Sequence, residues 1–121
     1  STVENGCVQY VPGSHRWGLL DKPDLAGDMM GIMNYLSPEQ QKEFKPVPVE
    51  VKAGEGIFHH PLTLHGSGEN KSNRPRRAFV INVFADGVRS DSDDTLLTGV
   101  PAIPKGEKIE GQFFPLLYGK G

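Results

Sequence analysis

The sequence has a single cysteine, no long apolar run and no excess of basic charge. One cysteine, Cys7, excludes an internal disulfide, and its place in a short β-type run predicts a small buried side chain. The first residues have neither the basic start nor the apolar stretch of a signal peptide, and no run reaches membrane-spanning length. These absences predict a reducing, cytoplasmic location and no membrane partner.

The charge is nearly balanced, with 13 Lys and Arg against 15 Asp and Glu. Nucleic-acid-binding domains usually carry a basic face, so no nucleic-acid partner is expected. The length of 121 residues fits a single domain. We expect residues 1–86 to form its core and residues 87–121 an irregular tail, in which the acidic patch of Asp91, Asp93 and Asp94 is a solvated loop.

Short β-type runs alternate with turn signals along the chain. They predict strands near residues 7–11, 47–51, 57–60, 62–65 and 76–85. One short helix is expected from Ser37 to about Phe44, because Ser37 can cap it, Pro38 suits its first turn and Gln40 can reach back to Ser37. An apolar patch is expected just before it, from Met29, Met30, Ile32, Met33 and Leu36. The pattern therefore predicts a mostly β fold, a sandwich or jelly roll with about five strands.

A histidine and an arginine, eleven positions apart, carry the clearest chemical signal. Strand alternation puts His65 on the face of Thr63, and Arg76 on that of Val80 and Phe84. If both faces line one barrel, His65 and Arg76 meet in a mostly apolar cavity. A buried arginine needs a partner, and a bound carboxylate would supply one through charge-assisted hydrogen bonds. The hydroxyl of Ser67 can join the same carboxylate, and an imidazole beside it is a plausible metal donor.

Each of these residues also has a purely structural interpretation. His65 alone in a strand is typical of a buried, hydrogen-bonded histidine, and Arg76 belongs to a basic group whose other members, Arg74 and Arg77, we expect in solvent. The remaining candidates have equally simple explanations: loop capping for Ser67 and Asn70, strand ends for His59 and His60, of which only one can face inward, a turn for His15, and packing for Trp17.

Several motifs follow one another in a fixed order and spacing. They are Asn5-Gly6-Cys7-Val8, Val11-Pro12-Gly13-Ser14-His15, Val51-Lys52-Ala53-Gly54-Glu55-Gly56, Phe58-His59-His60-Pro61, and His65-Gly66-Ser67-Gly68-Glu69-Asn70 followed by Arg76. This ordered set resembles the phytanoyl-CoA dioxygenase family over residues 3–86. The resemblance implies a double-stranded β-helix, cupin-like fold and an Fe(II)- and 2-oxoglutarate-dependent dioxygenase acting on a small-molecule substrate.

The resemblance also assigns residues. It implies that His65 is the distal iron ligand, that Arg76 holds the far carboxylate of 2-oxoglutarate, and that Ser67 is a hydroxyl near that arginine. The family's two other iron ligands form a His-X-Asp pair, and none of the four histidines here is followed two residues later by an acidic residue.

In the family, that pair lies upstream of the segment that matches Asn5-Gly6. We therefore expect a truncated, inactive member with an incomplete iron site, whose open sheet edges favour homo-oligomers. Three alternatives stay open: a related halogenase, in which a small residue replaces the metal carboxylate; a cupin-like carboxylate-binding module without redox activity; and an assembly role.

Overall fold

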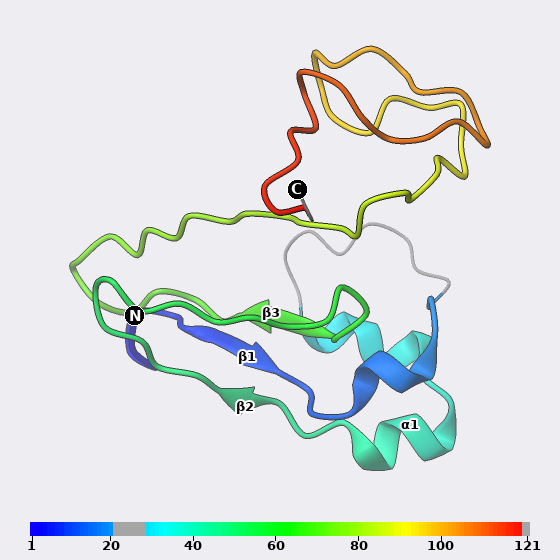
Figure 1. The fold of residues 1–121 in the computed structure, drawn as a ribbon. Helices are drawn as coiled ribbons and strands as arrows, with labels where there is room; N and C mark the ends of the chain where they lie inside the picture. Colours follow the sequence, from blue (N-terminus) through cyan, green and yellow to red (C-terminus); the bar gives the residue numbers. More distant parts are fainter. Residues whose placement is uncertain (21–28, 120–121) are drawn as a thin grey trace. The chain divides into compact units, whose positions relative to one another are not determined.

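The computed structural model describes residues 1–20 and 29–119, and it divides into two compact units, Ser1–Ala78 and Phe79–Gly121. The first unit contains a three-stranded antiparallel sheet of β1 (Val8–Tyr10), β2 (Val47–Pro48) and β3 (His65–Ser67), in the order β2-β1-β3 (Figure 1). The strands are short, but backbone hydrogen bonds continue beyond them, from Val11 N to Leu64 O at 2.9 Å and from Val49 N to Val8 O at 3.0 Å. The central strand β1 thus holds both of its neighbours.

The helices lie together at the end of the sheet toward which β1 runs (Figure 1). They are η1 (Ser14–Trp17), η2 (Met29–Tyr35) and α1 (Pro38–Glu43). They help to form a small apolar core of Val11, Ile32, Leu36 and Phe44, against which Trp17, Leu20, Met33 and Leu64 pack. Of the predicted apolar patch, Ile32 and Leu36 are buried while Met30 is exposed, and the side chain of Met29 lies outside the described residues. Cys7 is buried, as expected.

Helix α1 begins and ends as the sequence predicts. Ser37 Oγ accepts a hydrogen bond from Gln40 N at 3.2 Å, and Gln40 Oε1 accepts one from Ser37 N at 2.8 Å. The two bonds form a capping box, which satisfies backbone donors that the first turn leaves unpaired. Phe44 is the C-cap, and the backbone turns extended there, in keeping with Pro46 two residues on.

The prediction of about five strands is wrong for the described residues, which form three. Residues 57–60 are not a strand, and β3 starts only at His65. The physical reason is a turn around Pro61, which the hydrogen bond from Thr63 N to His60 O closes at 2.9 Å. Because of this turn, residues 57–60 and 62–64 do not pair as extended strands. The predicted strand at 47–51 is shortened to Val47–Pro48.

Residues 76–85 form no strand either, although they have the strongest β-type composition. Within the described residues no ladder pairs with them, and Phe79 is 91% exposed, with Val80, Ile81, Val83 and Phe84 also exposed. A strand that is apolar on both faces needs neighbours on both sides and cover above and below. The described residues do not supply that cover.

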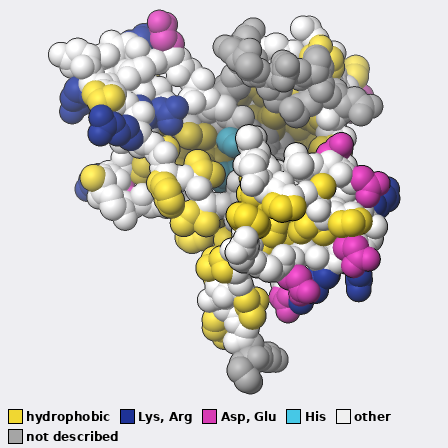
Figure 2. Space-filling model, turned by 90° about the horizontal axis from the view of Figure 1, so that it is seen from above, with side chains coloured by type: hydrophobic (Ala, Val, Ile, Leu, Met, Phe, Trp, Pro, Cys, Tyr) yellow, Lys and Arg dark blue, Asp and Glu magenta, His cyan; other side chains and the backbone are white. Residues whose placement is uncertain are grey.

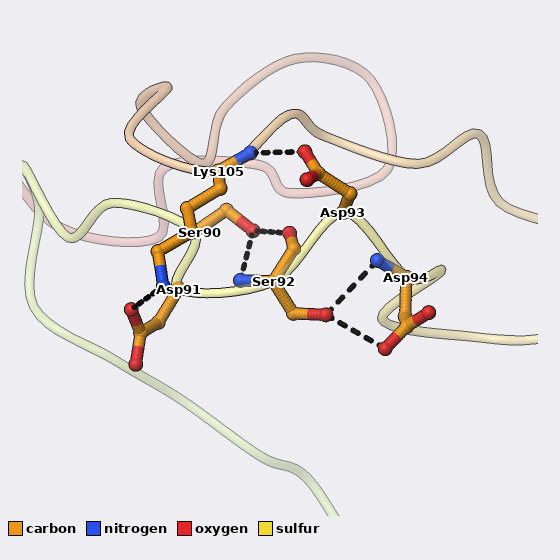
Figure 3. A network of polar contacts seen from close by, with 6 residues as sticks. All are labelled: Ser90, Asp91, Ser92, Asp93, Asp94 and Lys105. Atoms are coloured by element: carbon orange, nitrogen blue, oxygen red, sulfur yellow. Dashed lines mark hydrogen bonds and ion pairs between the residues drawn. The ribbon is translucent and has the colours of Figure 1, made fainter.

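The second unit is held by turns and polar contacts rather than by regular elements. Ser90, which is buried, and Ser92 exchange local hydrogen bonds, while Lys105 reaches Asp91 with its ammonium at 3.1 Å and Asp93 with its backbone N–H at 2.8 Å (Figure 3). The acidic patch is therefore an exposed loop, as predicted, and Lys105 forms an ion pair with one of its three carboxylates. A single bridge, Arg89 to Lys108, is the only ladder element found there among described residues.

Hydrophobic side chains are exposed at many places on the surface (Figure 2). In the second unit they include those of the Phe113–Tyr118 segment, whose Phe114 ring lies 6.1 Å from that of Phe84. None of the helices in residues 1–20 and 29–119 has the length and apolar character needed to cross a membrane.

Candidate functional site

Strand β3 carries two of the three predicted site residues. His65 and Ser67 are two positions apart, so they project to the same side of the strand, opposite to Leu64, which packs against the core. The register with β1 places His65 beside Tyr10 and Ser67 beside Val8. The sheet therefore holds the imidazole and the hydroxyl on one face.

A buried serine anchors the start of β3. Ser14 is 2% exposed, donates from Oγ to Val11 O at 2.7 Å and accepts from Leu64 N at 2.8 Å. The sequence predicts a turn at His15 and no separate role for Ser14. The structure shows that the Ser14 hydroxyl joins this turn to the residue before His65, a long-range contact that no local pattern reveals.

The third predicted residue, Arg76, meets Ser67. Its Nη2 donates to Ser67 Oγ at 3.1 Å, and its side chain is half-buried, whereas Arg74 and Arg77 are exposed. None of the ion pairs within the described residues involves Arg76. A guanidinium has five N–H donors in a planar fork, so one bond to Ser67 leaves donors for an anion.

His65 is oriented by a hydrogen bond of 2.8 Å between its Nδ1 and the carbonyl of Thr63. A carbonyl can only accept, so Nδ1 carries a proton, and in the neutral imidazole Nε2 then has the free lone pair. Metal-binding histidines in proteins commonly donate their other ring N–H in this way. His65 is exposed, however, so the predicted enclosed chamber around His65 and Arg76 is absent from the described residues.

Two further rings surround His65, which sequence reasoning did not foresee as a group. The Tyr10 ring stacks at 5.6 Å and 25° on His65, and the His59 ring lies 4.6 Å from His65 and 5.0 Å from Tyr10, centre to centre. Burial lowers the pKa of His59, and the nearby His65 lowers it further, while burial raises the pKa of Tyr10. His60 instead lies beside His15, at 5.5 Å.

An open hollow of about 180 Å³ adjoins this group. Its lining is mostly apolar and includes Leu20, Ile32, Leu62 and Leu64, and its polar members are Ser14, Thr63 and His65. Asn70, a further candidate, does not reach a shared site, because its side chain bonds Ser72 and Arg74 O within its own loop. Trp17 packs at the core and donates from Nε1 to Glu43 at 3.2 Å, in line with a packing role.

The iron that the family resemblance implies needs a larger donor set. Within the described residues no three histidine, cysteine or acidic side chains come together in a group able to hold a metal ion, and the sequence contains no His-X-Asp or His-X-Glu. His65 alone therefore does not fit a complete facial triad. The pair of Arg76 and Ser67 does fit a carboxylate, since it offers a cation and a hydroxyl side by side.

Comparison with known proteins identifies the family. The sequence model of the phytanoyl-CoA dioxygenase (PhyH) family matches residues 1–78. A phytanoyl-CoA dioxygenase of Arabidopsis thaliana is 38% identical over 96 residues, which cover 78% of this chain and 33% of the relative. The peroxisomal phytanoyl-CoA dioxygenase of Bos taurus is 37% identical over 84 residues, which cover 68% of this chain and 24% of the relative.

A probable phytanoyl-CoA dioxygenase of Caenorhabditis elegans is 34% identical over 116 residues, covering 86% of this chain and 36% of the relative. The chain thus spans about a quarter to a third of the length of these relatives. No solved structure matches it. The family match covers the sheet, the ring group and the contact between Ser67 and Arg76, and on this ground the chain belongs to the phytanoyl-CoA dioxygenase family.

Proposed function

We propose that this chain contributes the 2-oxoglutarate anchor and one iron ligand to an Fe(II)- and 2-oxoglutarate-dependent dioxygenase site. The observation that carries the proposal is the hydrogen bond of 3.1 Å between Arg76 and Ser67. It joins a half-buried cation to a hydroxyl, and Arg76 has no acidic partner among the ion pairs of the described residues.

A dicarboxylate suits this pair for a physical reason. Arg76 can give two parallel N–H bonds to a carboxylate, and Ser67 can add a third donor. The neighbouring loop does not compete, because Asn70 is engaged within it and the side chains of Arg74 and Arg77 are exposed. The far carboxylate of 2-oxoglutarate is the ligand that the family relationship suggests.

The role of His65 rests on its orientation. Its protonated Nδ1 is held by Thr63 O, so Nε2 is the nitrogen available to a metal. In a complete site, iron and 2-oxoglutarate supply the oxidising chemistry. This chain's own part is to hold the carboxylate and to present one imidazole. The 121 residues hold no His-X-Asp or His-X-Glu pair, so we expect no turnover from this chain alone.

The test is binding of 2-oxoglutarate by calorimetry to the wild-type chain and to Arg76→Ala and Arg77→Ala. The two variants remove the same charge from adjacent positions, but only Arg76 contacts Ser67. We expect Arg76→Ala to weaken binding at least about tenfold, the low end for a hydrogen bond to a charged group, and Arg77→Ala to change it little. Equal losses in both variants, or no binding by the wild type, would refute the anchor.

A cupin-like carboxylate-binding module without redox activity is the second candidate, because the contact between Arg76 and Ser67 is complete without any metal. Succinate release in the presence of iron(II), 2-oxoglutarate and ascorbate separates the two functions. Succinate from the chain joined to a segment that supplies the missing ligands would establish the dioxygenase. Retained binding without succinate in that joined protein would leave the binding module. The cytoplasmic location, the small-molecule substrate and self-association stay predictions.

A further inference from the structure

One peptide group connects a buried serine to the candidate histidine. Ser14 Oγ accepts a hydrogen bond of 2.8 Å from Leu64 N. Thr63 O accepts one of 2.8 Å from Nδ1 of His65. Leu64 N–H and Thr63 C=O belong to the same peptide group, which is trans and planar, so that its N–H and C=O point in opposite directions. The bond to Ser14 on one side therefore fixes the direction of the carbonyl that meets His65 on the other.

The local sequence explains why a side chain, and not the backbone, makes the bond to Leu64 N–H. Val11, just after β1, still donates from its own N–H to Leu64 O at 2.9 Å. The next residue, Pro12, has no N–H, and Gly13 turns the chain with φ +84°. Beyond this turn, the Ser14 hydroxyl takes the place of a backbone acceptor for Leu64 N–H.

The Ser14 hydroxyl is itself held in one orientation. Ser14 is 2% exposed, and its Oγ donates to Val11 O at 2.7 Å. A hydroxyl has one hydrogen, so with that hydrogen directed to Val11 it is a lone pair that faces Leu64 N–H. Since a buried N–H without a partner costs free energy, this bond keeps the peptide group between Thr63 and Leu64 from rotating.

We propose that Ser14 is a positioning residue, which fixes the tautomer and the direction of the His65 imidazole through the peptide group between Thr63 and Leu64. The carbonyl of Thr63 keeps the proton of the neutral ring on Nδ1 and leaves Nε2 unprotonated. All four residues line the same open hollow. This inference rests on the proposed function and deepens it, because it concerns the imidazole that the function assigns to a metal.

The test is nitrogen-15 NMR of the histidine rings, which distinguishes a protonated ring nitrogen from a bare one. It uses the full chain without metal or 2-oxoglutarate, in alkaline solution, where free imidazole is neutral. His60 is an internal reference, because its Nδ1 accepts a hydrogen bond from Leu62 N at 3.1 Å and its proton in the neutral ring is then on Nε2. In the wild type we expect the proton on Nδ1 in His65 and on Nε2 in His60.

Ser14→Ala removes the acceptor for Leu64 N–H. It should change the ratio of the two His65 tautomers at least about twofold, the low end for the loss of one hydrogen bond, and leave His60 unchanged. Ser14→Thr keeps the hydroxyl and should restore the wild-type ratio. Ser37→Ala is the matched control for general destabilisation, because it removes the cap of α1 in the same unit, and it should keep the wild-type ratio.

Circular dichroism in the far ultraviolet checks the folding of each variant. If Ser14→Ala does not fold, Ser14→Cys replaces it, because sulfur is a weak hydrogen-bond acceptor. A wild-type His65 with its proton on Nε2, an unchanged ratio in the Ser14 variant that lacks the hydroxyl, or an equal change in Ser37→Ala would overturn the proposal. Because the NMR samples contain no 2-oxoglutarate, this outcome is distinct from failure of the carboxylate anchor, which calorimetry detects.

Discussion

Replacement of Gly6 by alanine should disturb the loop that follows the candidate site. Gly6 has φ +75°, and a Cβ built there would lie 2.6 Å from Gly68 O and 3.2 Å from Glu69 O. Gly68 directly follows Ser67, so the backbone that must move adjoins the carboxylate anchor. The left-handed conformation costs alanine about 1–2 kcal/mol, and the overpacking adds about 1–3 kcal/mol.

Gly54→Ala is the matched control, because Gly54 has φ +88° and a Cβ there would meet nothing within 4 Å. Both variants carry the backbone strain of a positive φ, and both stiffen the unfolded chain. The difference between their unfolding temperatures therefore isolates the contact of residue 6 with Gly68. For a unit of this size, 1 kcal/mol corresponds to about 4–8 °C in Tm. We therefore expect thermal unfolding of Gly6→Ala at least about 4 °C below that of Gly54→Ala. Coincident unfolding curves would show that the close approach of Gly6 to Gly68 is wrong.

Three further predictions concern other parts of the chain. Ser37→Ala should destabilise the first unit by about 1 kcal/mol, because it removes the cap of α1; denaturant unfolding measures this, and no change would contradict the capping box. Lys108 lowers the pKa of Asp86 through a hydrogen bond and its charge. Because the pKa of Asp86 is lower in the folded state, its pairing with Lys108 stabilises the fold at pH values above the unfolded pKa. This stabilisation is lost as the pH falls through the folded-state pKa. In Lys108→Met, carboxyl NMR titration should show a higher pKa of Asp86. The exposed apolar segment around Phe79 should drive self-association, and a strictly monomeric species in sedimentation at high concentration would refute it.

The features that sequence reasoning predicted well are local. The capping box of α1 needs only Ser37 and Gln40, three positions apart, and both hydrogen bonds are present. The contact between Ser67 and Arg76 follows from a motif read within one short segment. The capping box lies within one helical turn, and nine positions separate Ser67 from Arg76, so neither contact depends on the pairing of distant segments.

The sequence alone determined that helix, and it predicts which side chains would hold a carboxylate or a metal. Tertiary structure decided the rest. Residues 76–85 have strand composition but no strand, because a ladder requires a second segment to pair with and the described residues provide none. Likewise, Tyr10 and His59 meet His65 only because β1 and β3 pair in one register and the turn at Pro61 brings His59 back to them. Pairing between distant segments depends on the whole set of competing partners, which no local pattern contains.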